Sequence, residues 1–172
     1  MTPLHRASES NYGNVDIAQF VIEHGANVTA QDENGSTPLH GWSGSEHGKV
    51  DLVRFLVDHD ADVTARDKYE STPLHKASIR GRVDLARFLV ERGAGVSALT
   101  EAKLTPLHIA SSYGVSINFA RFLVEHGADV TVRGEHGLTL LGHVELTHFL
   151  KTVRPKAGLL HSISRRLGNV WK

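Results

Sequence analysis

Histidine is the side chain of this sequence with the widest chemical repertoire, because imidazole transfers protons near neutral pH and binds metal ions. The chain has 12 histidines in 172 residues and no cysteine. His143 and His148 flank a glutamate in His-Val-Glu-Leu-Thr-His, which superficially resembles a zinc-protease helix. That chemistry needs histidines four residues apart. A separation of five residues is roughly 500° of helical rotation and leaves the imidazoles about 140° apart, so we expect no shared metal ion.

A serine nucleophile is the second candidate for chemistry. Gly41-Trp42-Ser43-Gly44-Ser45 approaches the nucleophile-elbow pattern but lacks its last glycine. It also follows a predicted helix start, whereas the elbow needs a strand before the serine. The sequence contains no phosphate loop and no dinucleotide fingerprint. We therefore predict a protein with no enzymatic activity, no cofactor and no metal.

Four histidines belong to a repeated tetrapeptide, which indicates a structural role for them. Thr-Pro-Leu-His occurs at 2–5, 37–40, 72–75 and 105–108, at spacings of 35, 35 and 33 residues, and a damaged copy lies at 139–141. A period of this size is typical of repeat proteins. Three further histidines, His24, His59 and His126, fall at predicted helix C-termini, where a partly charged imidazole interacts favourably with the helix dipole.

Each copy predicts two short helices and an irregular arm. In the third copy, Thr72 is a helix N-cap and Pro73 occupies the first helical position. This helix ends near Gly81, and a second helix with a wide apolar face runs from about Val83 to Gly93, which caps it. Turn residues then form an arm before the next copy. One phenylalanine in each second helix is predicted to mark the stacking core: Phe20, Phe55, Phe88, Phe122 and Phe149.

The unit resembles the ankyrin repeat over residues 2–150, through Thr-Pro-Leu-His-x-Ala followed by Gly-x-Val-Asp-Leu-x-x-Phe-Leu-Val-x-x-Gly-Ala-x-Val. The resemblance implies an all-α solenoid of stacked helix-turn-helix units with projecting β-turn arms and a concave groove. It assigns the motif histidines to hydrogen bonds that brace the arms. It also implies binding of a protein partner rather than catalysis. We expect repeats near 2–34, 37–69, 72–102 and 105–136, a degenerate unit at 139–150 and a separate tail at 151–172.

Several copies depart from the pattern. Trp42 occupies the alanine position of the motif, either within the core or as a partly exposed anchor beside the groove. The glycines beside it predict a distorted or short first helix, since each costs roughly 1 kcal/mol relative to alanine. Asp60 replaces a capping glycine and Glu70 an arm glycine, both at positions that favour a left-handed backbone. Two extra residues in the first copy and two in the second are expected to bulge before the second helix.

Register along the repeat places the variable, exposed positions on the arm tips and first helices. Tyrosine and arginine are enriched in binding hot spots, so Tyr69, Tyr113 and Arg66 are the preferred anchors. The predicted partner-binding residues are Gln31, Glu33, Asn34, Arg66, Lys68, Tyr69, Ile79, Arg80, Leu99, Glu101, Tyr113, Arg133, Glu135 and His136.

The C-terminal tail supports an alternative function. Residues 151–172 hold six of the 19 basic side chains and no acidic one, which leaves the preceding body with a net charge of about −6. The apolar stripe of 157–171 predicts either a helix that caps the degenerate fifth unit or an interfacial membrane anchor. A nucleic-acid partner is not expected, because the acidic body repels phosphate. Membrane contact is expected only through this tail.

Two further expectations concern the ends of the chain and its location. No signal peptide, membrane-spanning run or cysteine is present, which favours a cytoplasmic or nuclear protein. The first copy has no preceding arm or polar capping repeat, so weak self-association through its apolar outer face is expected.

Overall fold

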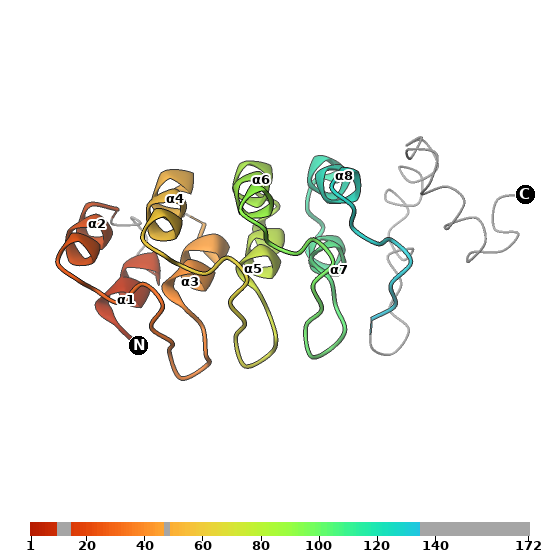
Figure 1. Ribbon diagram of the computed structural model, residues 1–172. Coiled ribbons are helices and arrows are strands. Elements are labelled where there is room, and N and C mark those ends of the chain that lie inside the picture. Colours follow the sequence, from red (N-terminus) through yellow and green to blue (C-terminus); the bar gives the residue numbers. More distant parts are fainter. Residues whose placement is uncertain (10–14, 47–48, 135–172) are drawn as a thin grey trace, which may run out of the picture.

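The computed structural model describes residues 1–9, 15–46 and 49–134, which form eight α-helices and no strand. These helices form four successive pairs, and Figure 1 shows the pairs in a row, with the first helix of each pair in one layer and the second in another. Loops between successive pairs project together beyond the first helices. The helices are α1 (Pro3–Glu9), α2 (Val15–Glu23), α3 (Pro38–Gly44), α4 (Val50–Asp58), α5 (Pro73–Arg80), α6 (Val83–Glu91), α7 (Pro106–Ser112) and α8 (Ile117–Glu125).

The all-helical solenoid predicted from the repeat is confirmed. The first helices contact one another in the order α1, α3, α5, α7, and the second helices in the order α2, α4, α6, α8. Because each short helix buries its apolar side against its neighbours in the row, stability is shared over adjacent interfaces. The fifth unit, the tail and both predicted bulges lie wholly or partly outside the described residues.

Three motif histidines, His5, His40 and His75, brace successive repeats, as the resemblance implied. In the third copy the Thr72 hydroxyl and backbone N–H lie 2.8 and 3.1 Å from His75 Nδ1. The Nε2–H of His75 donates to the Leu104 carbonyl oxygen, 3.1 Å away in the next arm. His40 makes the same bridge to Ser71 at 3.0 Å, and His5 to Ser36 at 2.8 Å. Since Nδ1 of His40 and of His75 accepts a backbone N–H, these two imidazoles are neutral, with the proton on Nε2.

The histidines at the ends of the second helices are also structural. His24, His59 and His126 each place Nδ1 2.7 to 2.8 Å from the carbonyl oxygen four residues earlier. Each ring stacks on the phenylalanine of the same turn, with ring centroids 4.1 Å apart. The same carbonyl oxygens also accept the backbone N–H of the histidine, so each ring adds a second contact at the C-terminal end of its helix.

The prediction of one core phenylalanine per copy is wrong for the first copy and holds only in part for the second, where Phe55 is half-buried; Phe149 lies outside the described residues. Phe88 and Phe122 are 4% exposed, whereas Phe20 is 59% exposed. The Arg54 guanidinium covers the Phe88 ring and that of Arg87 covers Phe122, each from the preceding second helix. Within the described residues, no guanidinium lies over the Phe20 ring in this way. Self-association through this face stays a prediction.

Trp42 lies in the core, with no exposed surface. The expected shortening of α3 is not found, because α3 spans seven residues, as do α1 and α7. A Cβ at Gly41 would lie 2.4 Å from Ser8 Oγ, so glycine allows α1 and α3 to approach closely. Gly41 therefore lowers the helix propensity of α3 but allows close packing between α1 and α3.

Positive backbone φ recurs at equivalent loop positions whether or not glycine is present. Asp60 has φ of 69°, in the place where other copies have capping glycines, and Glu70 has φ of 58°, in the place of Gly35. Lys103 occupies the equivalent position in the next arm, with φ of 57°. The strain expected from the sequence at Asp60 and Glu70 is confirmed, and Lys103 adds a third such site.

Candidate protein-interaction surface

Three arms carry most of the predicted partner-binding residues. We define arm 1 as residues 30–36, arm 2 as 65–71 and arm 3 as 98–104. Adjacent arms are hydrogen-bonded at their tips, because the Lys68 N–H donates to the Asn34 carbonyl oxygen at 2.8 Å and the Glu101 N–H to that of Tyr69 at 2.9 Å. The arms therefore hold one another in place.

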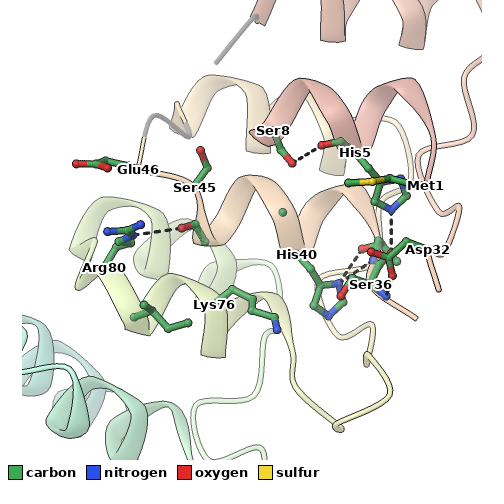
Figure 2. Close-up of a pocket in the computed structure, with 14 residues that line it drawn as sticks. Met1, His5, Ser8, Asp32, Ser36, His40, Ser45, Glu46, Lys76 and Arg80 are labelled. Carbon is green, nitrogen blue, oxygen red and sulfur yellow. Dashed lines mark hydrogen bonds between the residues drawn. The ribbon is translucent and has the colours of Figure 1, made fainter. Parts of the chain in front are cut away.

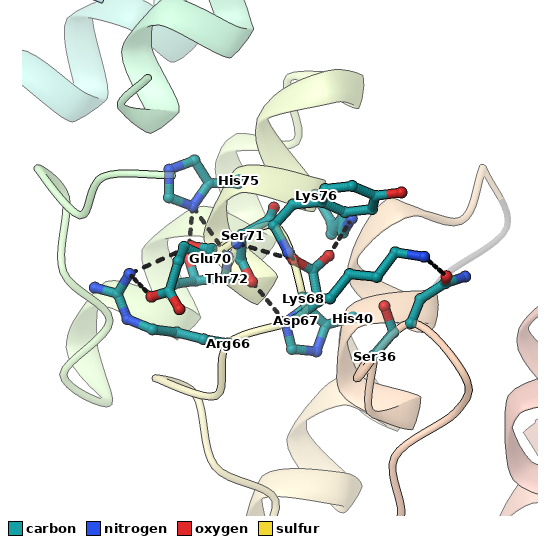
Figure 3. A network of polar contacts seen from close by, with 12 residues as sticks. Ser36, His40, Arg66, Asp67, Lys68, Glu70, Ser71, Thr72, His75 and Lys76 are labelled. Atoms are coloured by element: carbon teal, nitrogen blue, oxygen red, sulfur yellow. Dashed lines mark hydrogen bonds and ion pairs between the residues drawn. The ribbon is translucent and has the colours of Figure 1, made fainter. Parts of the chain in front are cut away.

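A buried aspartate organises arm 2. Oδ1 of Asp67 accepts the backbone N–H groups of Tyr69 and Ser71, both at 2.9 Å, and Oδ2 lies 2.8 Å from the Lys76 ammonium on α5. Figure 3 shows these contacts converging on one carboxylate. Burial alone would raise the pKa of Asp67, but the Lys76 ammonium and the two amide bonds outweigh it and lower that pKa. The carboxylate stays ionised and fixes Tyr69 relative to α5.

Two of the motif histidines, His40 and His75, are held in the neutral form by their surroundings. Burial lowers the pKa of His75 to about 4, although its bond to Leu104 acts in the opposite direction. Burial also lowers the pKa of His40. A neutral imidazole can keep hydrogen bonds on both ring nitrogens and so hold the arm in place. Protonation of Nδ1 would displace the threonine N–H that this nitrogen accepts. These histidines position the arms beside the site.

The first helices and the arms form one face of the protein, which we call the concave face. Its larger depression, the polar hollow, has a volume of about 570 Å³ and lies across α1, α3 and α5 (Figure 2). Small and polar groups dominate the wall formed by α3 and the residue after it, where Gly41, Gly44 and Ser45 line the space. Ile79 and Arg80 of α5 form the opposite wall, and the Arg80 Nε–H donates to the Gly44 carbonyl oxygen at 3.4 Å.

A second depression, the apolar hollow, lies between α5 and α7 and has a volume of about 270 Å³. Two tyrosines line it, Tyr69 from arm 2 and Tyr113 from the end of α7, and they are 54% and 61% exposed. Such exposure of large rings contrasts with Leu74 of α5 and Leu107 of α7, which are fully buried. The other lining residues are Ser71, His75, Lys76, Ile79, Thr100, Glu101, Ala102, Leu104 and Ile109.

The structure brings together only part of the predicted partner-binding set. Five of its residues line the two hollows: Tyr69, Ile79, Arg80, Glu101 and Tyr113. Gln31 and Arg66 line a different hollow of about 450 Å³, together with Asp62 and Thr64 from the loop after α4. Arg66 is also committed within the protein, because its Nη1 contacts the Glu70 carboxylate at 2.9 Å and the Leu99 carbonyl oxygen at 3.0 Å.

The remaining predicted residues lie outside these three hollows. Asn34 and Lys68 are exposed and bonded to each other through their side chains. Glu33, Leu99 and Arg133 are exposed, on or next to the arms. Glu135 and His136 lie outside the described residues, as does the tail at 151–172.

The comparison with protein families supplies the family of this fold. A model described as ankyrin repeats (3 copies) matches residues 4–100 and 44–134. The chain belongs to the ankyrin repeat family. It has no significant match to a curated protein sequence. Ankyrin repeats are generally protein–protein interaction modules and are typically non-catalytic.

Other features of this ankyrin repeat protein bear on the alternatives. In the described ranges, no helix is long and apolar enough to cross a membrane. The same residues contain no group of three or more histidine, aspartate or glutamate side chains that could hold a metal ion. The pair His143 and His148 lies beyond these ranges.

Two residues of the hollows, Lys76 and Ile109, were missed by sequence reasoning. Each directly follows the histidine of its ankyrin motif, at equivalent positions of α5 and α7. Helical spacing could have identified both, because residues three and four apart share a face. Lys76 is three and four residues from Ile79 and Arg80, and Ile109 is four residues from Tyr113.

Proposed function

We propose that this ankyrin repeat protein binds a protein partner through its concave face, with the two hollows as the centre of the contact. The observation that carries the proposal is the apolar hollow, where Tyr69 and Tyr113 are more than half exposed beside buried first-helix leucines. Tyrosine is enriched in binding hot spots, because it combines a large apolar ring with a polar tip and few rotatable bonds.

The proposal is supported by the rigidity of the surface around the hollows. The backbone bonds between arm tips and the histidine bridges fix the arms to the first helices. A preformed surface loses little conformational freedom on binding, and this favours affinity. The partner-binding residues that we propose are therefore Tyr69, Ile79, Arg80, Glu101 and Tyr113.

Site-specific photo-crosslinking tests which face the partner contacts. A photoreactive phenylalanine derivative replaces Ile79 on the concave face, and in a matched variant it replaces Arg87, which is exposed on α6. Irradiation in an extract of the source cells should give a discrete covalent adduct with the first variant and none with the second. An adduct formed only through position 87 would place the partner on the second helices and contradict the proposal.

A further inference from the structure

The apolar hollow is sized for one side chain. Its volume of about 270 Å³ lies just below the range of roughly 300 to 1,000 Å³ that is typical of sites for drug-sized molecules. Ile79, Ile109 and Leu104 line it together with the two tyrosine rings. A bulky aliphatic or aromatic side chain would cover these surfaces and gain about 25 cal/mol for each Å² of apolar area removed from water.

A cation without an ion pair lies beside this hollow. Arg80 is exposed and makes one long bond, to the Gly44 carbonyl oxygen at 3.4 Å. The described residues give its guanidinium no carboxylate partner, whereas the Lys76 ammonium is paired with Asp67 at 2.8 Å. Arg80 therefore keeps free N–H donors, and a carboxylate is the group that satisfies them best, through two parallel bonds.

Neighbouring acidic groups do not already fill this role. Asp32 lines the polar hollow, but its Oδ1 accepts the N–H groups of Asn34 and Ser36 within arm 1. Glu46 lies on α3's side of the same hollow, and Figure 2 shows it beyond the end of α3. A partner carboxylate would reach Arg80 from the side of Ile79, which lines both hollows.

We propose, on the basis of the function above, that the partner presents a peptide segment with one bulky apolar side chain and a nearby carboxylate. The apolar side chain enters the hollow between Tyr69 and Tyr113, and the carboxylate pairs with Arg80. Because Arg80 directly follows Ile79 on α5, the two groups of the partner lie within a few residues of each other. The apolar contact provides affinity, and the charge contact provides specificity and orientation.

Selection from a displayed library of random peptides on the intact chain tests this chemistry. The enriched peptides should share a bulky apolar residue with aspartate or glutamate close by. The anisotropy of synthetic fluorescent copies then gives their affinities. We expect Tyr113→Ala to weaken binding by about tenfold or more, as for a hot-spot residue, and Phe20→Ala to leave it unchanged. Phe20 is a matched control, since it is 59% exposed but lies on α2.

A charge exchange tests the carboxylate separately. Arg80→Glu should reject the acidic peptide and regain binding when lysine replaces its carboxylate residue, whereas Arg87→Gln, on α6, should change neither affinity. Peptides that photo-crosslink to position 79 but are indifferent to the Tyr113 and Arg80 changes would overturn this inference and leave the proposed function intact. Failure to enrich any peptide, or binding that maps to the second helices, would contradict both.

Discussion

The two hollows of the concave face are built from equivalent positions of successive repeats, yet their chemistry differs. Gly41 and Gly44 of α3 and the following Ser45 line the polar hollow, whereas Ile109 of α7 and the following Tyr113 line the apolar hollow. In the second copy the large side chain is in the core, where Trp42 is fully buried. The equivalent core residues of the next two copies are the small Ala77 and Ala110, and their larger side chains lie at the surface. The same scaffold thus offers a wide polar depression and a narrow apolar one.

The largest effect should come from the buried tryptophan behind the polar hollow. Trp42→Ala restores the motif residue but removes a fully buried aromatic ring, and it should lower the free energy of unfolding by about 3–5 kcal/mol. Urea unfolding followed by circular dichroism measures the change, with Trp42→Phe as a milder control. A loss below about 1 kcal/mol would show that α3 repacks around alanine. The small side chains that line the polar hollow would then not be a consequence of the buried tryptophan.

Acid should weaken the histidine bridges next to both hollows. The pKa of His75 is lowered to about 4 in the folded state, against 6.5 as its ordinary value. Between these values the unfolded chain binds a proton that the folded chain does not. Stability is therefore present above pH 6.5 and falls with decreasing pH, by about 1.4 kcal/mol per pH unit for this residue.

Urea unfolding at several pH values between 7 and 4 measures this slope. His75→Gln should reduce the slope, because it removes the imidazole whose pKa is lowered in the folded state. An unchanged slope in the His75 variant would mean that the acid response arises elsewhere.

The tyrosines of the apolar hollow should separate binding from stability. Tyr69→Ala and Tyr113→Ala should each weaken partner binding by about tenfold, close to 1.4 kcal/mol, with the melting temperature unchanged. Phe88→Ala should instead lower stability, by about 3–5 kcal/mol, since Phe88 is 4% exposed. Should the tyrosine variants melt as far below the parent as the phenylalanine variant, the two rings belong to the core and do not form a binding site.

The smallest effect should appear at the tip of arm 3, beside the apolar hollow. Lys103 has φ of 57°, so Lys103→Gly should stabilise the protein by about 1 kcal/mol. The equivalent Gly35 of arm 1 provides the reciprocal test, because a Cβ there would lie 3.2 Å from the Lys68 backbone nitrogen. Gly35→Ala should therefore destabilise. The melting temperatures of both variants measure these effects. Equal shifts in the two variants would show that the arms do not differ in backbone strain.

The repeat pattern allowed much of the fold to be predicted. Threonine and proline at fixed places set the starts of α3, α5 and α7, because N-capping and a fixed proline φ act locally. The burial of each phenylalanine could not be predicted in the same way. It depends on contacts from other helices, such as the Arg54 guanidinium of α4 that lies over the Phe88 ring, so Phe20 is exposed and Phe88 is buried although their local sequence pattern is the same.

The candidate site was less predictable than the fold. Register identified which residues lie on the arms, but it did not show which side of an arm each residue faces. Gln31 and Arg66 line the hollow that includes the loop after α4, whereas Tyr69 and Glu101 line the apolar hollow. The side of an arm that a residue faces depends on the path of the backbone through that arm. The positions of variable residues along the sequence do not contain this information.

The central claim is that the apolar hollow of the concave face is the principal contact with the partner. Backbone amide shifts of the isotopically labelled chain, recorded during titration with a selected peptide, test it most directly. The largest changes should cluster on arm 2, at the end of α5 and along α7, around Tyr69, Ile79 and Tyr113. Changes concentrated instead on α4, α6 and α8, with these three residues unaffected, would contradict the claim.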